Sequence, residues 1–286
     1  MPKPIIKSIG PSKCYCLEKK SDTAAIFFHG VPFNASFWLP VLEESELPYS
    51  CYAIDLKGFG FSADDSRLSD FGLLDQLSWL ESIVQNIPAE KYVFIMHGWS
   101  SVPATMLAQK LGNKISGLVY FEAQVRAVRS PDMLSLPMQV VAEQLLSQEN
   151  LEEWVLKDNG YPELIMPLAT TGCLQTIKQQ FAKQFESIVC RKAILQYLKE
   201  LPLGYKQSDI VKLIDMNAVY LERSNFAKCL MYTMPGLMTT METVSWVKNN
   251  VKHVSILDLG HAMHCAPITM TKHFTSELSA WLRSSI

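Results

Sequence analysis

The 286-residue sequence lacks several features that would assign it to a membrane or to nucleic acid. It contains no uninterrupted apolar run of about 18 residues, the length that a membrane-spanning helix requires. Met1 to Lys7 holds no apolar stretch long enough for a signal peptide. Lysine and arginine number 26 and aspartate and glutamate 28, so no basic surface for nucleic acid is indicated. We expect a cytoplasmic protein that binds neither nucleic acid nor membrane.

The sequence also lacks a recognisable metal or cofactor motif. Its seven cysteines are odd in number and lie mostly in apolar runs, which is typical of reduced core residues. Cys14 and Cys16 have the wrong spacing for a zinc knuckle or a redox pair, and no other His or Cys cluster completes a ligand set. The glycine pairs lack the strand and helix that frame a dinucleotide-binding loop. We therefore predict no metal and no cofactor.

What is present is an alternation of buried strands and amphipathic helices, in a chain that is 48% hydrophobic and 19% charged. This alternation is typical of an α/β fold with a mostly parallel sheet. Strands are predicted over 24–28, 51–56, 92–97, 115–122, 229–233 and 254–259, with a hairpin over 4–19 and helices over 36–42, 73–87, 102–109 and 274–282. Residues 123–207 show only helical patterns, so we predict a helical lid inserted into a core domain of residues 1–122 and 208–286.

The stretch from Tyr92 to Ser101 is an apolar strand that ends abruptly in small residues before a helical pattern begins. In hydrolases built as strand, tight turn and helix, the nucleophile lies at the tip of the turn. A G-x-S register makes Ser100 the nucleophile. In the other register Gly98 occupies the tip, and no attacking group is present. The serine register lengthens the strand by two residues and leaves His97 and Trp99 unexplained.

Two other segments point to the same site. The turn His29-Gly30-Val31-Pro32 follows a buried strand, and its glycine lets the amide of Val31 face the tip. Together with the amide of Trp99, it would form an oxyanion hole. Glu122 ends the strand over 115–122, at the sheet edge where the active sites of such folds collect.

A histidine near the end of the chain supplies a candidate general base. His261 directly follows Gly260 at the end of the last predicted strand, and a histidine held by a buried carboxylate is a general base near neutral pH. His264, a few residues later, is a competing candidate. We prefer His261, with Glu122 as the acid that orients it.

Six motifs carry a family resemblance: His29-Gly30-x-Pro32, Asp55-x-x-Gly58-x-Gly60-x-Ser62, His97-x-Trp99, Tyr120-Phe121-Glu122-Ala123, Met234-Pro235-Gly236-Leu237 and Gly260-His261. Together they resemble the haloalkane dehalogenases and the Renilla luciferase that shares their fold, over nearly the whole chain. The resemblance implies an α/β-hydrolase fold, with a mostly parallel eight-stranded sheet flanked by helices and an inserted helical lid.

The resemblance also implies a mechanism with an aspartate nucleophile, a histidine base, an acid and two halide-stabilising groups. His261, Glu122 and Trp99 match three of these roles, and the spacing of the strand favours the register with Gly98 at the tip. The sequence departs from the family at Gly98, where the nucleophile belongs, and at Val31, where an asparagine binds halide. Because both the attacking carboxylate and the halide-binding asparagine are missing, ordinary dehalogenation should be absent or very slow.

Three functions remain open at this point. The first is an enzyme that uses His261 and Glu122 as a general base on a small apolar substrate. The second is a non-catalytic protein that binds a small apolar ligand. The third is a serine esterase that works through Ser100. Either a monomer or a homodimer is compatible with the sequence, and fold alone does not decide among these functions.

Overall fold

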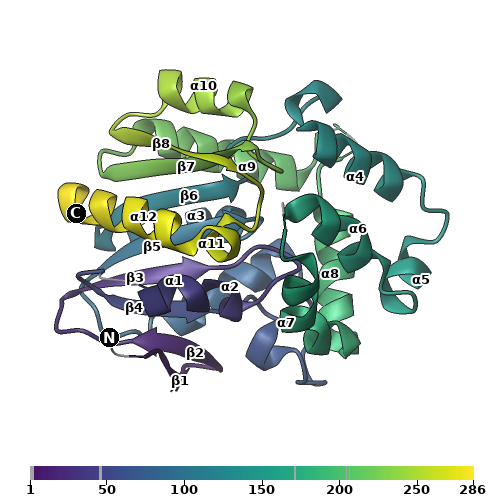
Figure 1. Ribbon diagram of the computed structural model, residues 1–286, viewed down its shortest axis with the longest axis horizontal. Helices are drawn as coiled ribbons and strands as arrows, with labels where there is room; N and C mark the ends of the chain where they lie inside the picture. The colour runs from purple at the N-terminus through teal and green to yellow at the C-terminus, as the bar shows by residue number, and fades with distance from the viewer. Residues whose placement is uncertain (1–2, 45–46, 171, 204, 206) are drawn as a thin grey trace.

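A computed structural model of the protein describes residues 3–44, 47–170, 172–203, 205 and 207–286, and its centre is one eight-stranded sheet (Figure 1). The strands follow the order β1-β2-β4-β3-β5-β6-β7-β8 across the sheet. Their bounds are β1 Ile5–Ile9, β2 Ser12–Leu17, β3 Thr23–Phe28, β4 Ser50–Ile54, β5 Lys91–Gly98, β6 Ile115–Ala123, β7 Ala227–Pro235 and β8 Val254–Ala262. The predicted α/β-hydrolase fold is confirmed.

The pairing of the strands follows from their sequences. β1 and β2 form the predicted antiparallel hairpin, and β2 pairs antiparallel with β4. All later pairs, from β4 with β3 to β7 with β8, are parallel. The central strands β3 and β5 are apolar and almost fully buried, as expected for parallel strands that are covered on both faces.

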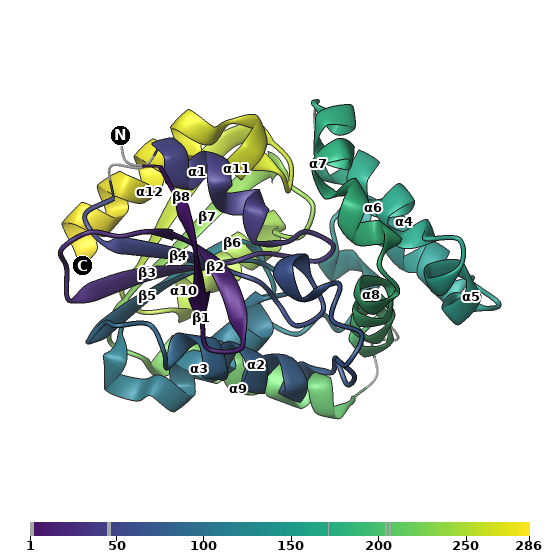
Figure 2. The same ribbon diagram turned by 90° about the horizontal axis from the view of Figure 1, so that it is seen from below.

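Helices cover both faces of this sheet. Figure 2 shows α1, α11 and α12 on one face and α2, α3 and α9 on the other. The bounds are α1 Leu39–Glu44, α2 Leu73–Val84, α3 Ser101–Leu111, α9 Asp209–Arg223, α10 Met241–Asn250, α11 Ala266–Thr269 and α12 Thr271–Ser285. None of the described helices combines the length and the apolar character needed to cross a membrane.

The remaining helices lie together beyond the carboxyl ends of the parallel strands, on the right of Figure 1. We call them the cap helices: α4 Leu136–Leu146, α5 Leu151–Leu156, α6 Gly160–Ala169, α7 Leu174–Glu186 and α8 Ile188–Glu200. They occupy the stretch predicted to be helical, although the sequence pattern did not single out α6 or α8. The exact domain limits at residues 122, 123, 207 and 208 stay a prediction.

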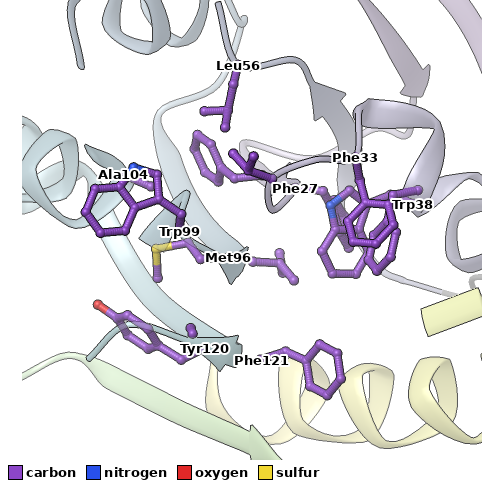
Figure 3. Close-up of a cluster of buried hydrophobic side chains, with 14 of the residues drawn as sticks. Phe27, Phe33, Trp38, Leu56, Met96, Trp99, Ala104, Tyr120 and Phe121 are labelled. Carbon is purple, nitrogen blue, oxygen red and sulfur yellow. The ribbon is translucent and has the colours of Figure 1, made fainter. Parts of the chain in front are cut away.

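The core fills both faces of the sheet at the point where β5 ends. Figure 3 shows Met96, Trp99 and Ala104 near one another, with Phe33 and Trp38 gathered on the other side of the strand. All five side chains are buried. The end of β5 is therefore held rigidly by aromatic packing, which suits a turn that must present one residue in a fixed position.

Candidate functional site

The turn between β5 and α3 places Gly98 at its tip. Gly98 is the last residue of β5 and has a φ of +59°, a conformation that favours glycine. A Cβ atom added there would lie 3.1 Å from Cα of Gly30 and 3.4 Å from Cε1 and Nε2 of His264. The side of Gly98 that would carry a side chain therefore faces the imidazole of His264.

His264 and Glu122 form a buried pair. Nδ1 of His264 lies 3.5 Å from Oε2 of Glu122, and the two residues are 2% and 0% exposed. This distance is long for a hydrogen bond, as is common for catalytic contacts without a bound ligand. Because the carboxylate accepts, the geometry favours a proton on Nδ1 and leaves Nε2 unprotonated toward Gly98.

The loop after β7 holds the carboxylate of Glu122 in place. Successive backbone amides of Leu237, Met238 and Thr239 donate to its two oxygens, at 2.5, 2.8 and 3.3 Å. Gly236 precedes them with a φ of +63°, and a Cβ atom there would lie 2.7 Å from Oε1 of Glu122. A buried carboxylate requires such donors, and this concave run of amides supplies them.

The prediction that His261 joins Glu122 is wrong. β8 continues to Ala262, three residues beyond the predicted end at Leu259, so His261 still belongs to the strand and pairs with Met234. Its side chain is exposed. His264, the competing candidate, lies in the loop after the strand and reaches Glu122. The competing histidine is therefore the one that contacts Glu122, and the end of the strand was misplaced in the prediction.

His97 supports the loop that carries His264. Its Nδ1 accepts from the amide of Gly30 at 3.1 Å, and its Nε2 donates to the carbonyl of His264 at 3.0 Å. The ring is stacked between Phe37 and Phe121, at centroid distances of 4.4 and 5.6 Å. Burial, and then the neighbouring His264, lower the pKa of His97 well below its usual value, so this imidazole is neutral.

Ser100 is not arranged as a nucleophile. It is 0% exposed, and its Oγ lies 2.8 Å from the carbonyl of His97 and 3.2 Å from that of Phe28. The hydroxyl of Ser101 donates to the carbonyl of Gly98 at 2.8 Å. Among the described residues, no imidazole accepts a hydrogen bond from either serine, whereas an activated serine requires such a base.

Trp99 directly follows the tip, and Val31 follows Gly30, which lies against the tip; both side chains are buried. The structure records no acceptor among the described residues for the backbone amide of either residue. The ring of Trp99 packs edge-on against Tyr197 of α8, with centroids 5.5 Å apart. Trp99 therefore connects the turn to the cap helices. An oxyanion hole made by the two amides stays a prediction.

Aromatic side chains close the site. The ring of Phe33 lies 6.2 Å from that of His264 and packs edge-on against Phe181 of α7 at 5.1 Å. Beside the site is a cavity of about 40 Å³, whose lining includes Ala123 of β6 and, from the cap helices, Met138 and Tyr197. This volume holds no more than a few water molecules. A larger ligand can enter only if the cap side chains move.

A third buried histidine, His29, directly follows β3. The amide of Leu56 donates to Nε2 of His29 at 3.0 Å, so this nitrogen has no proton, although it lies 3.7 Å from Asp55. Burial lowers the pKa of His29 to about 4. Burial also raises the pKa of Asp55 to about 7, partly offset by the amides of Ala35 and Phe61. The contact is therefore not an ion pair.

Comparison with known proteins shows which family the chain belongs to. The family model described as "Alpha/beta hydrolase family" matches residues 25–212. The chain belongs to this family. In the described part of the chain, no group of three or more His, Cys, Asp and Glu side chains is placed to hold a metal ion.

Individual relatives include a monooxygenase and haloalkane dehalogenases. The chain is 27% identical over 281 residues to a coelenterazine h 2-monooxygenase from Renilla reniformis, covering 94% of this chain and 88% of the relative. It is 20% identical over 264 residues to a haloalkane dehalogenase from Mesorhizobium japonicum, covering 92% and 85%. The structure of the haloalkane dehalogenase DatA from Agrobacterium tumefaciens C58 matches with a TM-score of 0.86 and 18% identity, covering 99% and 97%. These relatives are enzymes.

Proposed function

We propose that this α/β hydrolase is an enzyme in which His264, oriented by Glu122, acts as a general base on a small apolar substrate. The observation that supports this proposal is the orientation of the buried imidazole. One of its nitrogens contacts the carboxylate of Glu122, and the other faces Gly98, where no side chain intervenes. The proposal requires a substrate or a water molecule to bind at that position.

The chemistry follows from the protonation of the pair. Nε2 of His264 takes a proton from the substrate or from a water molecule, and the resulting imidazolium is stabilised by Glu122 through Nδ1. The negative charge that develops on the substrate would be bound by the amides of Val31 and Trp99, for which no acceptor competes among the residues that the structure describes. The apolar, buried surroundings strengthen each of these interactions.

The absence of a side chain at Gly98 separates this proposal from the dehalogenase reaction. Displacement of a halide requires a carboxylate that attacks carbon and donors that bind the leaving ion. Gly98 supplies no carboxylate, and Val31 has no side-chain donor. Base catalysis needs neither group, because the proton acceptor is the imidazole itself.

Turnover of a panel of esters, epoxides and weak carbon acids tests the proposal. His264→Gln should lower the rate on any active compound by about 100-fold or more, the size of a general-base contribution. His261→Gln is the matched control, because that side chain is exposed on β8, and it should leave the rate unchanged. Equal losses in the two variants, or full activity in His264→Gln, would refute the assignment.

A second function, ligand binding without catalysis, is supported by one observation. Phe33 lies beside the imidazole of His264 and is backed by Phe181, and the adjacent cavity measures only about 40 Å³. Native mass spectrometry of the purified protein distinguishes this reading. A retained small molecule, with no turnover of the panel by the wild-type protein, would favour the binding function over the enzyme.

A further inference from the structure

The cavity beside the site contains one charged group in a mostly apolar lining, whose uncharged polar members are Gln124, Tyr197 and Thr243. Its walls include Met133, Met138, Leu203 and Met238, which come from the loop before α4, from α4, from the segment after α8 and from the loop after β7. Of the described residues that line it, only Arg126 carries a charge. The site therefore combines an apolar surface with a single cation.

The guanidinium of Arg126 is buried and incompletely satisfied. Its side chain is 15% exposed, and its Cζ lies 5.9 Å from the ring centre of Trp246. Nη2 lies 2.9 Å from Oε1 of Glu242, but neither Nε nor Nη2 makes a hydrogen bond of acceptable geometry. A buried guanidinium with free donors is costly unless an anion pairs with it, so the arrangement favours a negatively charged ligand.

The partner that Arg126 has in the structure can be displaced. The side chain of Glu242 is 54% exposed, in the first turn of α10. Because water and salt reach this exposed carboxylate, they weaken its attraction to Arg126. Nε and Nη2 are both shielded from solvent in the structure, so a ligand carboxylate reaches them by taking the place of the Glu242 side chain. There it could meet both nitrogens, the two-pronged geometry that arginine favours. A planar anion therefore suits the position better than Glu242 does.

We infer that this cavity binds an amphipathic anion: an apolar chain that ends in a single carboxylate, with the carboxylate on Arg126. The three methionines in the lining are flexible and can move aside for a chain larger than the present 40 Å³. The inference goes beyond the proposed reaction and does not rest on it. It concerns equilibrium binding at Arg126, whereas the reaction concerns proton transfer at His264.

Titration calorimetry tests the inference, with octanoate and 1-octanol as probes at pH 7.5. Both probes are kept at concentrations below those at which they aggregate. The two probes share the chain and differ in charge. The wild-type protein should bind octanoate at least ten-fold more tightly than 1-octanol. Arg126→Met should weaken the affinity for octanoate by about ten-fold or more, as expected for the loss of a charge-assisted contact. The affinity for 1-octanol should change by less than about two-fold.

Three further variants separate the cavity from other sites. Arg129→Met is the matched control, because Arg129 lies three residues away, is 47% exposed and pairs with Asp215; it should change neither affinity. Met138→Trp fills the cavity and should weaken both probes. Glu242→Gln removes the competing carboxylate and should increase the affinity for octanoate. This test remains available if Arg126→Met does not fold.

Three results would overturn the inference. The first is equal affinity of the wild-type protein for the two probes. The second is an undiminished preference for octanoate in Arg126→Met. Arg126 would then only hold α10 in place through its ion pair with Glu242. The third is unchanged octanoate binding in Met138→Trp, which would place the anion elsewhere on the protein. Because only binding is measured, catalytic failure of the protein alters none of these outcomes.

Discussion

Replacing Gly98 with alanine should destabilise the protein in a way that reports the geometry of the turn. With a φ of +59°, Gly98 adopts a conformation that costs a residue with a Cβ atom about 1–3 kcal/mol. The added Cβ would also press on Cα of Gly30 at 3.1 Å, which is backbone and cannot swing aside. We therefore expect Gly98→Ala to lower the free energy of unfolding by at least about 2 kcal/mol, the backbone cost plus an overpacking cost.

Gly112→Ala is the matched control for this experiment. Gly112 has a φ of +55°, but a Cβ atom there would meet nothing within 4 Å. Urea unfolding of both variants, followed by circular dichroism, gives the two losses under identical conditions. The difference between them isolates the contact of the tip with Gly30 and His264. An equal or larger loss in Gly112→Ala would refute the packed tip described for Gly98.

Three other expectations follow from the buried groups. The pKa of His29 is lowered to about 4 in the folded state, so the unfolded chain binds this proton first and stability is lost as the pH falls. Between pH 8 and 5 the unfolding free energy of the wild-type protein should fall by about 2 kcal/mol more than that of His29→Asn. The raised pKa of Asp55 acts in the opposite direction, but in both proteins, so the comparison removes it. Parallel curves of stability against pH in urea titrations would contradict this. Glu122→Gln should lower the unfolding free energy by about 1–3 kcal/mol, because three backbone amides donate to the carboxylate. The exposed control Glu163→Gln should change it by less than about 0.5 kcal/mol. Equal effects in thermal or urea melts would contradict a stabilising role of these hydrogen bonds. Phe181→Ala should cost about 3–5 kcal/mol in the same melts, unless the cap helices collapse onto the vacated space.

Much of the fold could be read from the sequence because its signals are local. Apolar runs such as the one ending at Gly98 predicted the central strands, and the abrupt change to small residues predicted the turn. Glu122 was placed correctly because the carboxyl ends of parallel strands meet at one edge of the sheet. The structure adds that this carboxylate is buried and held by three amides of the loop after β7.

The choice between two histidines depended on where a strand ends, which local patterns determine poorly. Gly260 normally signals the end of a strand, yet β8 passes through it to Ala262, because its pairing with β7 continues to Pro235. The three additional residues moved the start of the loop, so that His264 and not His261 reaches Glu122. The cavity at Arg126 was unpredictable for a different reason, since its walls come from four separate segments of the chain.

One measurement tests the central claim, that Gly98 marks an empty nucleophile position facing a base at His264. Two triple variants, both with Gly98→Asp and Val31→Asn, would carry either His264→Phe or His261→Phe and be mixed with 1-bromohexane. The introduced carboxylate should attack carbon, release bromide and form an ester, whose hydrolysis requires water activated by the base.

Intact mass spectrometry and bromide release give the result. With His264→Phe, the account predicts a protein that gains one hexyl group and stops after a single release of bromide. With His261→Phe, it predicts continued bromide release without accumulation of the hexyl ester. The account would be contradicted by an ester that accumulates only in the His261→Phe variant, or by bromide release from the unmodified protein at an enzymatic rate.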